Sequence, residues 1–179
     1  MDEGLRIWTI GHSTHPIGVF VGLLARQAVR TLADVRLAPG SRRQPQFGRD
    51  KLAASLAEVG IAYEHLPELG GRREPRPDSP NTAWKNDAFR GYADYMETPE
   101  FEEGLARLLR IARSSPTAMM CAEGDWRECH RGLIADALKA RSVEVIHIAR
   151  DGGAAPHPYT SAARIVGGRL SYAAPGLFP

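Results

Sequence analysis

The sequence predicts a single α/β domain in which helices cover both faces of a mostly parallel sheet. Short apolar runs alternate along the chain with segments whose apolar residues recur at helical spacing. This alternation is typical of parallel strands joined by helical crossovers. A chain of 179 residues, 43% of them hydrophobic, can bury one sizeable core. We place the domain at residues 1–150 and treat residues 151–179 as a C-terminal extension, packed on the domain or partly flexible.

Five segments have the length and apolar content of strands, namely residues 7–10, 31–35, 61–66, 117–121 and 143–148. Five others have helical spacing, with signals such as Pro16 in a first turn and Gly60 after a last turn. Asp125 and Glu128 predict the start of the last helix, because one carboxylate can cap backbone N–H groups while the other reaches back. The helices are expected at residues 16–28, 50–59, 86–96, 99–112 and about 125–141.

The C-terminal extension has weaker signals. Its pattern is irregular, although Gly167-Gly168 between short apolar runs predicts a hairpin within residues 164–172. No apolar run is long enough for a membrane helix, and the N-terminal residues lack the basic and apolar regions of a secretory signal. Two cysteines are too few for a disulfide scaffold. We therefore expect a cytoplasmic protein that does not contact membranes.

Three of the predicted strands end in side chains that can carry chemistry. The first is followed by His12, the second ends at Asp34, and the fourth ends at Cys121 with Glu123 two residues later. Parallel strands bring these ends to one rim, where ligands bind in open α/β sheets. We expect a catalytic site there, in which His12 and Glu123 move protons. Cys121 is a nucleophile or a wall of the pocket, and the carboxylates of Asp34 and Glu123 are acid–base groups, helix caps or partners of arginine.

Arginines near the same rim indicate an anionic substrate. Arg36, Arg42 and Arg131 present planar guanidinium groups that match phosphate or carboxylate. Further candidates for substrate contact are Ser13, Ser41 and His130, although the two serine hydroxyls more commonly bond loop backbone. The predicted function is a hydrolase or transferase that acts on a phosphate-containing small molecule, such as a nucleotide, or on nucleic acid.

Two non-enzymatic alternatives remain open. Arginines in the loops at residues 36–49 and 72–76 would suit a nucleic-acid-binding module without catalysis, yet Phe47 is the only aromatic residue for stacking in the first loop. Cys121, Cys129 and His130 could bind a metal, with His12 added from another loop. Zinc is a candidate cofactor but is not favoured, because closely paired Cys-x2-Cys or His-x3-His spacing is missing.

The two cysteines also allow two other interpretations. Cys121 to Arg127 fits Cys-x5-Arg, a cradle in which a thiolate attacks phosphorus and arginine binds the oxygens. Glu123 and Asp125 lie inside this pattern and would repel a phosphate dianion. A redox pair is also conceivable, but no Cys-x-x-Cys is present.

An ordered series of motifs resembles one known family. They are Thr-Ile-Gly-His-Ser at 9–13, Asp-Val-Arg at 34–36, Leu-Gly-Gly at 69–71, Phe-Arg-Gly-Tyr-Ala-Asp-Tyr-Met at 89–96, Cys-Ala-Glu at 121–123 and Cys-His-Arg at 129–131. Over roughly residues 5–148 the chain resembles the domain of unknown function family 488. The resemblance implies an intracellular α/β domain whose marked residues coincide with the predicted rim, and it supplies no reaction. It includes Arg131 in a motif and leaves Arg127 outside, which weakens the Cys-x5-Arg interpretation.

Overall fold

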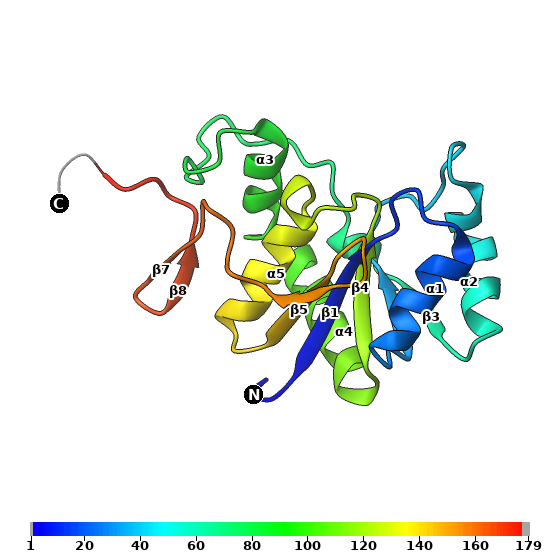
Figure 1. Cartoon of the computed structure of the whole chain (residues 1–179). Helices are drawn as coiled ribbons and strands as arrows, with labels where there is room; N and C mark the ends of the chain where they lie inside the picture. The colour runs from blue at the N-terminus through cyan, green and yellow to red at the C-terminus, as the bar shows by residue number, and fades with distance from the viewer. Residues whose placement is uncertain (1, 177–179) are drawn as a thin grey trace.

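Each of the five predicted apolar runs forms a strand in the computed structural model, which describes residues 2–176 (Figure 1). These strands pair in parallel within one six-stranded sheet of order β3-β2-β4-β1-β5-β6. The α/β class and the mostly parallel sheet are thereby confirmed. The parallel strands are β1 (Arg6–Gly11), β2 (Thr31–Asp34), β3 (Ala62–His65), β4 (Thr117–Cys121) and β5 (Glu144–Ile148).

The C-terminal extension contributes a strand that the sequence did not predict. β6 (Ala154–Pro156) pairs antiparallel with β5 at the edge of the sheet. Its three exposed residues, Ala-Ala-Pro, have no apolar alternation, so the sequence contains no strand signal there. The predicted hairpin is confirmed. It consists of β7 (Arg164–Val166) and β8 (Arg169–Ser171), joined by two glycines with positive φ.

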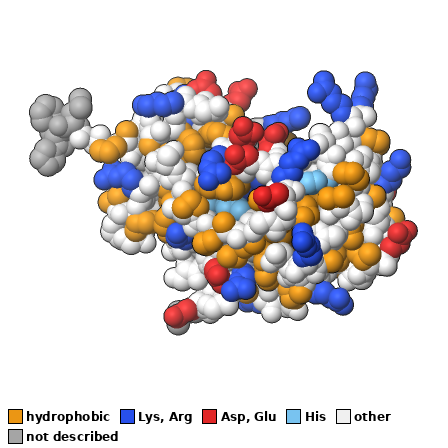
Figure 2. All heavy atoms as spheres, in the orientation of Figure 1, with side chains coloured by type: hydrophobic (Ala, Val, Ile, Leu, Met, Phe, Trp, Pro, Cys, Tyr) orange, Lys and Arg blue, Asp and Glu red, His pale blue; other side chains and the backbone are white. Residues whose placement is uncertain are grey.

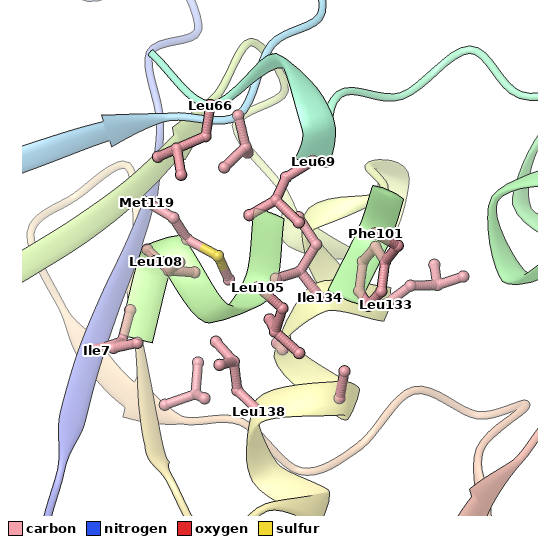
Figure 3. Packing of buried hydrophobic residues seen from close by; sticks show 14 of the residues in the cluster. Ile7, Leu66, Leu69, Phe101, Leu105, Leu108, Met119, Leu133, Ile134 and Leu138 are labelled. Atoms are coloured by element: carbon pink, nitrogen blue, oxygen red, sulfur yellow. The ribbon is translucent and has the colours of Figure 1, made fainter. Parts of the chain in front are cut away.

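Helices cover both faces of the sheet (Figure 1). On one face α1 (Ile17–Arg26) and α2 (Arg49–Ala57) bury Phe20, Leu24, Leu52 and Leu56 in one apolar cluster. On the other face lie α3 (Asp87–Tyr95), α4 (Pro99–Ser114) and α5 (Arg131–Ala140). Met119 of β4 and the leucines of α4 and α5 belong to one buried apolar cluster (Figure 3). Among residues 2–176, no helix has the length and apolar content needed to cross a membrane.

The connection between β4 and α5 differs from the prediction. Asp125 caps a short 3-10 helix, η3 (Trp126–Glu128), by accepting the backbone N–H of Arg127, and it does not cap α5. Cys129 then has an extended backbone, and α5 begins only at Arg131. The prediction of a helix from about residue 125 was therefore wrong, because the Asp125 side chain bonds the nearby backbone and stabilises a 3-10 turn in place of an α-helical start. This turn directs the Cys129 thiol back toward the end of β4.

Candidate active site at the carboxyl end of the sheet

The carboxyl ends of β1, β2 and β4 open into a pocket of about 490 Å³. This volume lies within the range of small-molecule sites. Figure 2 shows acidic, basic and histidine side chains meeting in the upper middle of the drawn face. Of the residues that the sequence predicted for the site, the pocket brings together His12, Arg36, Ser41, Cys121, Glu123 and His130.

The backbone beyond β1 and β4 continues to pair after the strands end. Gly11 lies opposite Cys121, and the N–H of His12 donates to the Cys121 carbonyl at 2.9 Å. A Cβ atom at position 11 would lie 1.7 Å from the carbonyl oxygen of Glu123. Only glycine permits this approach, so the Gly11-His12 sequence brings the imidazole beside the thiol-bearing loop.

The other predicted site residues lie around the pocket and do not line it. The Ser13 hydroxyl accepts a hydrogen bond from Arg150 at 3.1 Å. Arg42 is exposed on the loop outside the pocket, and Asp34 and Arg131 are buried beneath the rim. Within the pocket, the Ser41 hydroxyl accepts the backbone N–H of Gln44 at 3.0 Å, so this serine bonds loop backbone.

Asp34 positions Arg36. Its carboxylate accepts the Arg36 Nε at 2.9 Å and Nη2 at 2.7 Å, and also the Tyr63 hydroxyl at 2.5 Å. Arg36 donates a further bond to the carbonyl of Phe47 at 2.8 Å. The guanidinium is therefore fixed, and its Nη1 faces His12 Nε2 at 3.5 Å. With its oxygens committed in this way, Asp34 orients a cation at the pocket wall.

His12 has the geometry of a base. Its Nδ1 lies 2.9 Å from the Ser13 carbonyl, which can only accept, so Nδ1 carries the proton in the neutral ring. The lone pair then lies on Nε2, on the side of Arg36. The ring stacks on Phe47 with centroids 4.4 Å apart. Burial lowers the pKa of His12, and the hydrogen bond to the Ser13 carbonyl raises it. The charge of Arg36 lowers it further, so the net pKa lies below its ordinary value.

Cys121 and Cys129 form a pair of free, buried thiols with Sγ atoms 2.7 Å apart. Burial raises the pKa of both thiols. For Cys121 the hydrogen bond from Cys129 and the charge of Arg131 outweigh burial, and the net pKa is lowered. The pKa of Cys129 is raised by burial and by its neighbour Cys121. Cys121 is therefore the thiol that ionises first.

Arg131 is a buried guanidinium without a carboxylate partner among residues 2–176. It is 1% exposed, and its Nη2 donates to the carbonyls of Glu123 at 3.2 Å and Gly124 at 3.3 Å. Its Nε and Nη1 find no acceptor among the described side chains and backbone. The Cys121 thiol bonds the same Glu123 carbonyl at 3.7 Å. The sequence analysis assigned Arg131 to the substrate, whereas the structure places it beside the thiol pair.

His130 lies between the Cys129 thiol and the backbone that follows β2. Its Nε2–H donates to the Val35 carbonyl at 2.9 Å, so Nδ1 presents a lone pair to Cys129 Sγ at 3.4 Å. Burial lowers the pKa of His130 to about 4, which keeps the ring neutral near pH 7. Gly71 leaves room for this ring, since a Cβ there would lie 2.9 Å from Nδ1.

Sequence reasoning missed several pocket residues. Arg72 lines the pocket with φ +63°, a strained conformation for a non-glycine residue. Glu128, Phe89 and Tyr92 line it as well. The arginine-rich loop carried a signal for Arg72, and the motif at residues 89–96 carried one for Phe89 and Tyr92. Glu128 was predicted only to take part in a helix start. In contrast, Arg127 of the Cys-x5-Arg pattern is exposed, pairs with Asp125 and does not line the pocket.

The structure has a second, larger hollow away from the thiol pair. A larger hollow of about 670 Å³ lies between α3, α4, α5 and β8, but its lining contains no thiol or imidazole, and Arg141 there pairs with Glu102. Among residues 2–176, no group of three or more His, Cys, Asp or Glu side chains could hold a metal ion. The thiol-containing pocket therefore has the richer chemistry.

Comparison with known proteins identifies a family. The model described as Domain of unknown function DUF488 matches residues 16–138, which include the ends of β2 and β4 and begin just after His12. No curated protein and no solved structure matches the chain. The resemblance carried by the motifs is thereby confirmed. Since the match spans well over half of the 179 residues, the chain belongs to the family of unknown function DUF488.

Proposed function

We propose that this protein is an enzyme that uses the Cys121 thiolate to cleave or transfer the phosphoryl group of a nucleotide-like substrate. The observation that carries the proposal is the buried Arg131 guanidinium beside the thiol pair, which has no carboxylate partner within the described residues 2–176. A buried cation is costly unless an anion compensates it. An ionised Cys121 supplies that anion and is a strong nucleophile.

The pocket lining suits a substrate with an anionic end and a polar ring. Arg36, fixed by Asp34, and Arg72 present guanidinium groups that can bind phosphate oxygens. The carboxylates of Glu123 and Glu128 can accept hydrogen bonds from sugar hydroxyls or an amino group. Phe89 offers an aromatic surface. This mixture favours a nucleotide, whose sugar and base can donate to the carboxylates, over inorganic phosphate, which presents only anionic oxygens to them.

The proposed chemistry has two steps. Cys121 sulfur attacks phosphorus, a P–S bond forms, the P–O bond to the leaving group breaks, and the leaving oxygen takes a proton from solvent. His12 Nε2 then removes a proton from water, which attacks the thiophosphate and releases phosphate and the thiolate. An alcohol in place of water gives transfer. Arg36 stabilises the charge on the equatorial oxygens in both steps.

The test is a single-turnover experiment with nucleoside phosphates and an aryl phosphate on the reduced protein. We expect a covalent adduct on Cys121 whose mass equals the transferred group, no adduct in Cys121→Ser, and slowed breakdown of the adduct in His12→Ala. Arg131→Met should raise the pKa of Cys121, measured as the pH dependence of iodoacetamide alkylation. Arg127→Gln is the matched control, because this exposed arginine of the same connection does not line the pocket. Turnover that survives in Cys121→Ser would refute the proposal.

The second candidate is a nucleic-acid-binding module without catalysis. Arg42 and Arg43 are exposed on the loop after β2, and neither forms an ion pair within residues 2–176. If this candidate is correct, random oligonucleotides will bind with a steep salt dependence and without turnover. Arg42→Gln with Arg43→Gln would then weaken binding, whereas Cys121→Ser would not.

A further inference from the structure

The second thiol of the pocket has no role in the chemistry proposed above. Cys129 contacts Cys121 Sγ at 2.7 Å and His130 Nδ1 at 3.4 Å, and it lines the same pocket. A disulfide requires an S–S distance of about 2.05 Å, so closing the bond takes a movement of less than about 1 Å. The extended backbone at Cys129, which links η3 to α5, can supply such a movement more easily than a helix.

We infer that Cys121 and Cys129 form a redox-active dithiol that reduces small hydroperoxides. The inference rests on the Cys121 thiol that lines the pocket beside Cys129, which the proposed function also uses. It adds a resolving residue, Cys129, and a second substrate class. The pair lacks Cys-x-x-Cys spacing, and it is the turn through η3 that brings together two cysteines eight positions apart.

The first step oxidises Cys121. The thiolate attacks one oxygen of a hydroperoxide, an S–O bond forms and the O–O bond breaks. The leaving oxygen takes a proton from solvent and departs as water or an alcohol. Sulfur loses two electrons and the peroxide gains them, which leaves Cys121 as a sulfenic acid. The nearby guanidinium of Arg131 favours the thiolate that starts this step.

The second step forms the disulfide. Cys129 sulfur attacks Cys121 sulfur, the S–S bond forms, the S–O bond breaks, and the hydroxyl leaves as water with the proton of Cys129. Once Cys121 is a sulfenic acid, its thiolate no longer accepts the Cys129 proton. His130 Nδ1, which lies 3.4 Å from Cys129 Sγ with a free lone pair, can then take this proton and pass it to the leaving oxygen. A small dithiol then restores both thiols by exchange and is itself oxidised to its disulfide.

Thiol counting provides the test, because the chain has only these two cysteines. Fully reduced protein receives one equivalent of hydrogen peroxide, and the remaining thiols are titrated after unfolding. We expect both thiols to be lost for each peroxide consumed, severalfold faster than in the urea-unfolded chain. The product should be monomeric and dithiothreitol should restore both thiols. Oxidation no faster than in the unfolded chain, or disulfides formed only between chains, would overturn the inference.

Single substitutions separate the two steps. Cys129→Ser should stop at a sulfenic acid that a 1,3-diketone traps, and Cys121→Ser should leave Cys129 unoxidised. With Cys129 present, His130→Gln should increase the amount of sulfenic acid that the 1,3-diketone traps, without slowing the formation of the sulfenic acid. A sulfenic acid that persists in the wild-type protein would contradict the role of Cys129. Disulfide formation without any phosphoryl transfer would leave this inference intact and remove the proposed function, and transfer without disulfide formation would do the reverse.

Discussion

The Asp34 carboxylate binds the Arg36 guanidinium through both of its oxygens, and both side chains are buried beneath the pocket rim. A buried pair of this kind contributes little over an apolar pair, but breaking it leaves an uncompensated buried charge. Asp34 therefore gives Arg36 one orientation at the pocket wall. Removing the Asp34 charge should therefore lower the stability of the fold.

Asp34→Asn should lower the free energy of unfolding by about 3–5 kcal/mol, because the Arg36 charge stays buried without its counter-charge. Urea denaturation at pH 7 measures the change. The matched control is Glu144→Gln, which breaks the half-exposed Arg6–Glu144 pair and should cost less than about 1 kcal/mol. Equal effects of the two substitutions would show that the Asp34–Arg36 pair is not desolvated in solution.

Gly11→Ala should reduce the reactivity of Cys121 with iodoacetamide. The added methyl group would meet the Glu123 carbonyl oxygen at 1.7 Å, and this carbonyl contacts both the Cys121 thiol and the Arg131 guanidinium. The loop that holds Glu123 would have to move, and the Cys121 thiol would lose its contact with the Glu123 carbonyl. Alkylation rates at fixed pH, with circular dichroism to confirm folding, provide the measurement.

Gly22→Ala is the control for this substitution. Gly22 lies within α1, where a Cβ meets nothing within 4 Å. Alanine there should raise stability by about 0.5–1 kcal/mol, because glycine is unfavourable inside a helix, and should leave the alkylation rate unchanged. A normal alkylation rate in Gly11→Ala would mean that the loop can move without affecting the thiol.

The rim could be predicted from the sequence because its signals are local. Apolar runs mark strands, helical spacing separates them, and parallel strands place their carboxyl ends together. His12 and Cys121 could be assigned to one pocket by this reasoning alone, and the structure places both in its lining. The likeness in motifs added a family but no geometry.

The remaining features depend on turns and tertiary contacts that no pattern encodes. From the sequence, Asp125 could cap either η3 or α5. In the structure it caps η3, and the resulting turn brings Cys129 into contact with Cys121. Arg131 looks like any other arginine in the sequence, and its lack of a carboxylate partner follows only from what surrounds the start of α5. Arg72 enters the pocket through a backbone conformation that favours glycine.

The low pKa of His130 predicts that the fold loses stability in acid. The folded-state pKa of about 4 lies below the ordinary 6.5, so between these values the unfolded chain binds more protons. The free energy of unfolding should therefore fall as the pH drops from about 6.5 to 4, by roughly 3 kcal/mol from this group. The measurement is a series of urea denaturations between pH 7.5 and 4. Burial also lowers the pKa of His147, to about 2, and this residue adds to the same trend.

His130→Gln isolates the contribution of His130. The difference in stability between this variant and the wild type should shrink in magnitude or reverse as the pH falls, because glutamine does not titrate. The stability difference at pH 7.5 is the internal reference, because His130 is neutral there in both the folded and the unfolded wild-type chain. A difference that stays constant from pH 7.5 to 4 would contradict a neutral, buried His130.

Asp136 connects the C-terminal extension to α5. Its buried carboxylate accepts hydrogen bonds from His157 Nε2 at 2.7 Å, from the N–H and hydroxyl of Thr160 at 2.8 and 2.5 Å, and from the Tyr172 hydroxyl at 2.7 Å. Both hydroxyls donate to the same oxygen, Oδ2. In Asp136→Asn one carboxylate oxygen becomes an amide nitrogen that cannot accept, so buried donors lose their partner at about 1–3 kcal/mol each.

The expected result is local opening of residues 157–172 while the parallel sheet stays folded, because β1 to β5 do not include Asp136. Hydrogen exchange should show lost protection at Thr160, whose N–H donates to Asp136, and at Ala83, whose N–H donates to the Tyr172 carbonyl. Limited proteolysis should cut near the β7–β8 hairpin faster than in the wild type. Asp151→Asn is the control, since among residues 2–176 this exposed carboxylate accepts only the nearby backbone N–H of Gly153. Unchanged protection of Thr160 in Asp136→Asn would show that apolar packing, and not this carboxylate, attaches the extension to the domain.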